Sequence, residues 1–133
     1  MRAGRESSES REGEPTRMGS AARAQMLMSW VNSLQLGTPK ARGRELTLED
    51  MRDGTVIAAI VRLFAPNEPL YGIQERAVSA KACAHNLNEA LNVLRSKTGR
   101  YGQLYDSQGI LDGRQGPTVS MLEAAVEAFV LGP

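Results

Sequence analysis

The sequence predicts an all-α fold, a compact bundle of four main helices joined by short helical turns. Apolar residues recur every three to four positions in four stretches, residues 21–36, 55–64, 80–97 and 118–131, and this spacing places them on one face of a helix. Capping residues precede these stretches, and glycine or proline follows the first three of them. The 133 residues are enough for one domain with a core of its own.

Residues 1–19 differ in composition from the rest of the chain. They are rich in Arg, Glu, Ser and Gly and contain almost no apolar side chains, so they cannot bury enough surface to offset the entropy of ordering. We expect a disordered tail there and a folded domain over residues 20–133. The mixed charges of the tail favour a solvated leader over an arm that binds nucleic acid.

The first predicted helix begins after Ser20, which is placed to cap it, and runs to about Leu36. Gly37 is expected to stop the helix. Trp30, the only tryptophan in the chain, lies in the middle of the apolar face. Because an indole buries a large area, we interpret Trp30 as a core anchor and not as a ligand-stacking residue.

The stretch from Thr55 to Phe64 is the predicted centre of the core, because it is almost uninterruptedly apolar. Thr47 and Asp50 form a capping-box pattern ahead of it, and Asp53 supplies a second cap. Pro66 ends the helix, since proline cannot continue it. The β-branched residues in this stretch leave a buried strand as the alternative, but its length and caps favour a helix.

An irregular connector over residues 67–77 leads to the third helix. Tyr71 and Ile73 are expected to fold back onto the core from this connector. Ser79 is placed to cap the third helix, which is predicted from Ala80 to about residue 97.

The last helix is predicted over residues 118–131, with Pro117 in its first turn and a capping box made by Ser120 and Glu123. A short turn is predicted before it, between residues 106 and 112. Six side chains are expected to anchor the core of the whole bundle: Trp30, Ile57, Ile60, Phe64, Leu91 and Leu122.

The residues that catalysis or metal binding needs are sparse. His85 is the only histidine and Cys83 the only cysteine, too few ligands for a zinc site. Two residues that are two positions apart on a helix do not face each other, as a catalytic pair must. No phosphate-loop motif occurs. We therefore predict no enzyme, no cofactor and no metal.

Charge and apolarity exclude two classes of partner. The 16 basic and 15 acidic side chains nearly cancel, so no overall field predicts binding to nucleic acid or to an anionic membrane. No apolar run approaches the roughly 18 to 20 residues that span a bilayer, and the start of the chain has no secretory signal. The single cysteine fits a reducing compartment. We expect a cytoplasmic protein.

Four pieces of the sequence follow the order found in calponin-homology domains. Residues 26–32 carry a leucine-x-x-tryptophan signature, and residues 48–54 form a turn of the D-x-R-D-G kind. Residues 86–91 carry an N-x-x-x-A-L pattern, and residues 119–131 form a closing apolar helix. The chain resembles that family over residues 21–131. The resemblance implies a calponin-homology bundle in which the closing helix packs parallel to the third.

Within this family, residues 26–36 are most similar to the opening helix of the Hook-like and nuclear-mitotic-apparatus type, single domains at the head of coiled-coil proteins. The resemblance implies a non-enzymatic, cytoskeleton-associated module, first of all a microtubule-associated head domain. Two alternatives stay open: an adaptor that binds a helical peptide of a motor or scaffold protein without filament contact, and an actin-binding domain. A dimer is expected only where a coiled coil follows in a longer parent chain.

The resemblance also implies two binding surfaces. Exposed cations would meet the acidic tails of tubulin. The candidates for this surface are Lys40, Arg42, Arg44, Arg95, Lys97 and Arg100. An apolar groove beside the last helix would accept the anchors of a partner helix, and its candidate residues are Phe129 and Val130.

Overall fold

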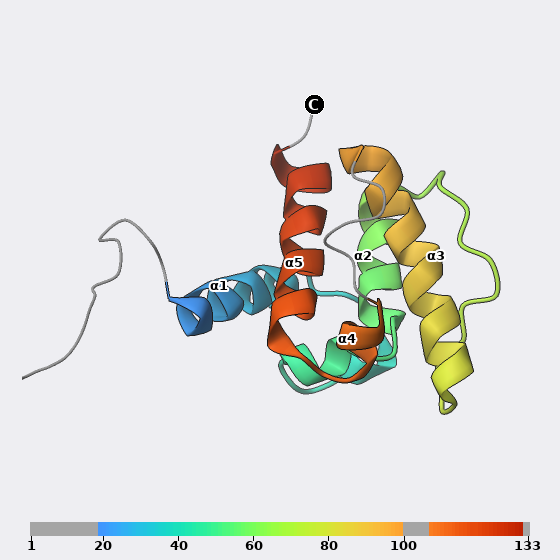
Figure 1. The fold of residues 1–133 in the computed structure, drawn as a ribbon, viewed down its shortest axis with the longest axis horizontal. Coiled ribbons are helices and arrows are strands. Elements are labelled where there is room, and N and C mark those ends of the chain that lie inside the picture. Colours follow the sequence, from blue (N-terminus) through green and yellow to red (C-terminus); the bar gives the residue numbers. More distant parts are fainter. Residues whose placement is uncertain (1–18, 100–106, 132–133) are drawn as a thin grey trace, which may run out of the picture.

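The computed structural model describes residues 19–99 and 107–131, and every regular element within these ranges is helical (Figure 1). Five α-helices occur in them: α1 (Ser20–Ser33), α2 (Thr55–Phe64), α3 (Ala80–Thr98), α4 (Ser107–Leu111) and α5 (Gln115–Val126). Two short 3₁₀ turns, η2 (Pro39–Ala41) and η3 (Leu48–Met51), lie between α1 and α2, and a π-helical turn, η4 (Glu127–Leu131), continues α5. The prediction of an all-α fold is confirmed for the described residues.

Helix α2 is the buried centre of the bundle. Helix α2 packs against α3, which also contacts α5, and Figure 1 shows α3 and α5 running in the same direction. Fully burying an aliphatic side chain stabilises a fold by about 1.5–3 kcal/mol, so α2 makes a large apolar contribution to the core. The predicted helix is confirmed, and the alternative strand is wrong. Five side chains of α2 have no exposed surface: Val56, Ile57, Ala58, Ile60 and Val61.

Two carboxylates close the turn that leads into α2. Asp50 Oδ2 accepts a hydrogen bond from the backbone N–H of Thr47 at 2.7 Å, which is the carboxylate half of the predicted capping box. Asp53 Oδ1 accepts hydrogen bonds from the N–H of Thr55 at 3.0 Å and from its hydroxyl at 2.7 Å. Asp53 thus caps α2 as predicted, although the residue in the N-cap position itself is Gly54.

Gly54 and Asn86 hold α2 against α3. A Cβ atom at Gly54 would lie 2.6 Å from Cβ of Asn86 and 2.6 Å from the backbone nitrogen of Leu87. The Asn86 side chain is fully buried and donates hydrogen bonds to the carbonyls of Asp53 at 3.0 Å and Gln74 at 2.9 Å. Its oxygen accepts a hydrogen bond from the N–H of Gln74 at 2.9 Å. One side chain therefore joins α3 to the turn before α2 and to the connector.

Helix α1 begins and ends earlier than predicted. Gly19 occupies the N-cap, and Ser20 is the first helical residue and not the cap. The helix ends at Ser33 because Gln35 adopts the left-handed conformation, with φ 53°. This conformation usually ends a helix at glycine, so the expected stop at Gly37 is wrong by two residues.

Two of the predicted core anchors lie at the edge of the core. Phe64 is 37% exposed, so its prediction as a buried anchor is wrong, because it is the last residue of α2 and leaves the core with the end of that helix. Trp30 is half-buried and packs against the core. The Phe64 ring is stacked between Trp30, at a centroid distance of 6.2 Å, and Phe129, at 5.3 Å. The other four anchors have no exposed surface: Ile57, Ile60, Leu91 and Leu122.

The connector before α3 is irregular, as predicted, and Ile73 is half-buried. Tyr71 is 69% exposed, so its predicted return to the core is wrong. Its backbone contacts α3 instead: the N–H donates to Glu89 Oε1 at 2.9 Å, and the carbonyl lies 2.6 Å from His85 Nε2. Ser79 caps α3 as predicted, since its hydroxyl accepts a hydrogen bond from the N–H of Ala82 at 3.0 Å.

The last helix begins at Gln115, three residues before its predicted start, with Arg114 as its N-cap. Pro117 lies in the first turn, as predicted. The capping box predicted from Ser120 and Glu123 is wrong, because both residues lie inside α5. Helix α4 matches the short turn predicted between residues 106 and 112. The predicted disordered tail, except for Gly19, falls outside the described residues.

We expect Gly54→Ala to lower the free energy of unfolding by about 2–5 kcal/mol, because the new Cβ atom adds left-handed backbone strain and overpacking against α3. Gly54 has φ 81°, and the nearest α3 atoms would be 2.6 Å from the added carbon. Gly37→Ala is the matched control, since nothing lies within 4 Å of a Cβ atom there. Urea unfolding of both variants measures the difference. Equal stabilities would contradict the close contact of α2 with α3.

Candidate functional site

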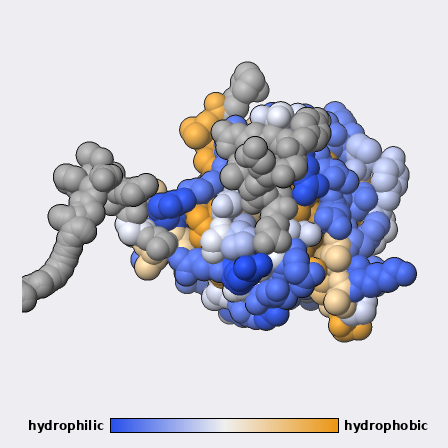
Figure 2. Space-filling view, in the orientation of Figure 1, coloured by the Kyte–Doolittle hydropathy of each residue, from blue (hydrophilic) through white to orange (hydrophobic). Residues whose placement is uncertain are grey.

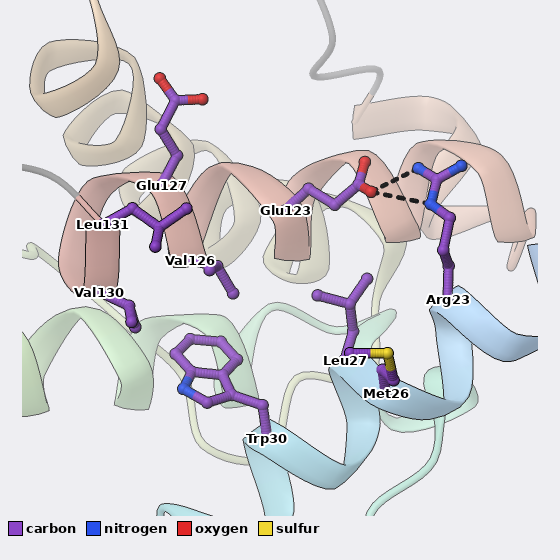
Figure 3. A pocket seen from close by; sticks show the side chains of 9 residues that line it. All are labelled: Arg23, Met26, Leu27, Trp30, Glu123, Val126, Glu127, Val130 and Leu131. Atoms are coloured by element: carbon purple, nitrogen blue, oxygen red, sulfur yellow. Dashed lines mark hydrogen bonds and ion pairs between the residues drawn. The ribbon is translucent and has the colours of Figure 1, made fainter. Parts of the chain in front are cut away.

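An apolar groove lies in the corner where α1 meets α5 and η4 (Figure 3). Its volume is about 490 Å³. The α1 wall consists of residues 23, 26, 27 and 30, and the other wall of residues 123, 126, 127, 130 and 131. Both walls follow the i, i+3, i+4, i+7 spacing that places side chains on one face of a helix. The groove is therefore a valley between two helical ridges.

Exposed aliphatic side chains border this groove. Met26 is 59% exposed, Val130 51% and Leu131 75%. Figure 2 shows hydrophobic surface gathered over the end of η4. Single exposed apolar residues are ordinary on a protein surface, but a contiguous apolar patch is typical of an interaction site. Because Met26, Val130 and Leu131 line one concave surface, they form a contiguous apolar patch of this kind.

An ion pair crosses one end of the groove. Arg23 of α1 donates from Nε to Glu123 Oε2 at 3.0 Å, and its Nη2 contacts the same oxygen. Both side chains are 43% exposed, so the pair contributes at most about 1 kcal/mol to stability. Its role is geometric, because it joins the two walls of the groove. Sequence reasoning missed this pair, since the two residues are 100 positions apart and Glu123 was assigned to a helix cap.

The structure separates the two residues predicted for a groove beside the last helix. Val130 lines the groove. Phe129 does not line it, and its ring stacks on Phe64 with an angle of 6° between the ring planes. The α1 wall was missing from the prediction, although Met26 and Leu27 precede Trp30 by four and three positions, which is helical spacing.

The three candidate cations after α1 differ in their surroundings. Lys40 Nζ lies 3.0 Å from Asp53 Oδ2. Arg44 donates two hydrogen bonds to Asp50, at 2.7 Å to Oδ1 and 3.0 Å to Oδ2. Arg42 is exposed and forms no ion pair with any described residue. Two of these three cations therefore have carboxylate partners that already satisfy them.

The other candidate cations lie at the end of α3. Lys97 Nζ lies 3.2 Å from Glu68 Oε2. Arg95 is half-buried and donates from Nη1 to Asn92 Oδ1 at 3.1 Å. Arg100 falls outside the described residues. Lys97 and Arg95 therefore each contact a polar side chain of the protein itself.

The Arg44–Asp50 pair shifts the pKa of both groups. The hydrogen bonds from Arg44 lower the pKa of Asp50, and this effect exceeds that of burial, which raises it. The same hydrogen bonds raise the pKa of Arg44. Asp50 also closes the turn before α2, so its charged form supports both contacts.

The described residues offer little for nucleophilic or metal chemistry. Burial raises the pKa of the Cys83 thiol, which disfavours the reactive thiolate. No group of three or more His, Cys, Asp or Glu residues within the described ranges is placed to hold a metal ion. Within the same ranges, no helix combines the length and apolarity that crossing a membrane requires.

No protein-family model matches the sequence, and no curated protein matches it either. The resemblance to calponin-homology domains therefore depends on the four sequence pieces alone. The groove between α1 and α5 depends on coordinates and is independent of that resemblance.

We expect Arg44→Gln to lower stability at neutral pH and to have no effect in strong acid. The pKa of Asp50 is lower in the folded state than the ordinary value of about 4, so the pair stabilises the fold above that pH. This stabilisation is lost as the pH falls from about 4 through the lower pKa of the folded state. Urea unfolding across this pH range measures the difference from the unchanged protein.

Arg42→Gln is the control for this experiment, because Arg42 is exposed and forms no ion pair with a described residue. A difference for Arg44→Gln that stays constant from neutral pH to strong acid would mean that Arg44 acts by packing and not by charge.

Proposed function

We propose that the chain is a non-enzymatic interaction domain of the calponin-homology type, which binds an amphipathic helix of a cytoskeletal partner protein. The groove between α1 and α5 supports this proposal most directly. Its two walls are helical stripes with aliphatic side chains exposed at the rim. Such a valley is the form that accepts a third helix, whose anchors at i, i+3 and i+4 fill the space between two ridges.

The charges at the rim define the partner further. Arg23 and Glu123 of the lining form an ion pair with each other, so neither requires a charged group on the partner. The expected occupant is therefore a helix with an aliphatic face, as a motor or scaffold protein would present it.

Direct binding of the domain to microtubules is the alternative that the sequence resemblance favoured, and binding to actin is a further one. Lys40, Arg44 and Lys97 already have carboxylate partners, which leaves less free positive charge for an acidic filament. Surface pairs of this kind are weak, so they reduce the attraction without abolishing it. The adaptor function is the one that the groove supports.

We expect Val130→Asp to weaken binding of a helical peptide at least tenfold, because it places a charge in the apolar groove. The peptide is selected from a displayed library of amphipathic helices. Trp30 lines the groove and is the only tryptophan, so its fluorescence reports occupancy during the titration. Val78→Asp is the matched control, since Val78 is a 95% exposed valine that does not line the groove. Equal losses in both variants would contradict the proposal.

Co-sedimentation with filaments tests the alternatives. We expect the isolated protein to pellet with microtubules or with actin no more than a control protein does, even at low salt. The charge reversals Arg42→Glu and Lys97→Glu are expected to change nothing. Pelleting that falls with added salt and with these reversals would favour direct filament binding over the adaptor function.

A further inference from the structure

A second hollow, of about 500 Å³, lies beside α2 and shares no lining residue with the groove. One of its walls is the stripe of α2 formed by Ala59, Arg62 and Leu63, at i, i+3 and i+4. Leu63 is 51% exposed, on a helix whose valine and isoleucine side chains are all buried. The opposite wall is the chain after α1, where Leu36 and Thr38 line the hollow. The hollow therefore has apolar surface on two sides.

The polar groups of this hollow carry positive charge. Arg42 and Arg62 both line it, and Glu75 is the one acidic residue of the lining. Arg62 Nη1 lies 3.3 Å from Glu75 Oε2, with both side chains about half exposed, and this distance exceeds that of a strong charge-assisted hydrogen bond. Arg42 forms no ion pair with a described residue. One positive charge in the lining is thus without a counter-charge.

Thr38 adds an independent observation. It is only 6% exposed, and its hydroxyl oxygen has no hydrogen-bond partner among the described residues. Buried hydroxyl groups are nearly always hydrogen-bonded. The oxygen itself has almost no exposed surface, so the Thr38 side chain has to turn toward the hollow to donate to a bound group. An anion beside Arg42 is a group that would accept this hydrogen bond.

We propose that this hollow binds the free carboxylate end of a partner peptide whose last side chain is aliphatic. In such a residue the carboxylate and the side chain are attached to the same Cα atom, so both reach one small hollow together. The side chain would pack on Leu36 and Leu63, and the carboxylate would accept hydrogen bonds from Arg42 and Thr38. A single negative charge balances the excess positive charge, whereas a phosphate group carries more charge and leaves the apolar walls uncovered.

Titration of the full chain followed by amide NMR tests this site. The probe is an acetylated six-residue peptide that ends in valine and leucine with a free carboxylate, and the same peptide with a terminal amide is its control. We expect shift changes confined to residues 34–42 and 59–63, and at least tenfold weaker binding of the amide. Arg42→Gln and Leu63→Ser are each expected to weaken binding at least fivefold. Both side chains are exposed, so the fold tolerates the changes.

Three results would overturn the proposal. The first is that the peptide with a terminal amide binds as tightly as the peptide with a free carboxylate. The second is that an amidated peptide with an internal glutamate binds as tightly as the free acid. The third is that inorganic phosphate produces the same shift changes with higher affinity. Val130→Asp is expected to leave this titration unchanged, because Val130 lines the other groove. Failure of this site and failure of the helix-binding groove are therefore distinguishable.

Discussion

The close contact between the turn at Gly54 and helix α3 is the constraint on which the rest of the structure depends. With no Cβ atom at Gly54, the backbone of α2 reaches Asn86 at a distance that no other residue allows. The buried Asn86 amide then satisfies carbonyls of the preceding turn and of the connector, which would otherwise lose their hydrogen bonds on burial. A polar side chain thus makes it possible to bury the start of an apolar helix.

The position of α2 determines the geometry of both hollows. Its last residue, Phe64, stacks on Trp30 from α1 and on Phe129 from η4. These contacts fix the end of α1 that bears Trp30 against the end of the last helix, and the groove is the space between them. The side of α2 that carries Leu63 forms a wall of the second hollow. Both surfaces therefore follow from the register of one buried helix.

Local sequence patterns were sufficient for the helices and for several of their caps. The apolar stretch of α2, the cap at Ser79 and the role of Asp53 all depend on residues a few positions apart. The end of α1 could not be predicted in this way, because Gln35 adopts a backbone conformation that its side chain does not favour. Its N–H donates to the carbonyl of Asn32 at 3.3 Å, and the local sequence gives no signal for a left-handed residue there.

The candidate sites, like the helix ends, could be predicted only where they depend on residues close together in the sequence. The apolar face of the last helix indicated a groove, but the wall from α1 depends on contacts between segments about a hundred residues apart, such as Arg23 with Glu123. Charge alone indicated a cationic surface, and it could not show that Lys40 faces Asp53 and that Lys97 faces Glu68. A count of charges gives the net charge of a surface but not which charges remain available.

Helix α1 connects the two surfaces, since its residues 23, 26, 27 and 30 line the groove and the chain after its end lines the second hollow. Binding at one surface would affect the other only if α1 moved relative to α2. Two contacts resist this movement: Val31 is fully buried, and Asn32 exchanges hydrogen bonds with the backbone of Leu46 at 2.7 and 3.1 Å. Because α1 is held both by apolar packing and by this polar contact, we expect binding at one surface to leave the other unchanged.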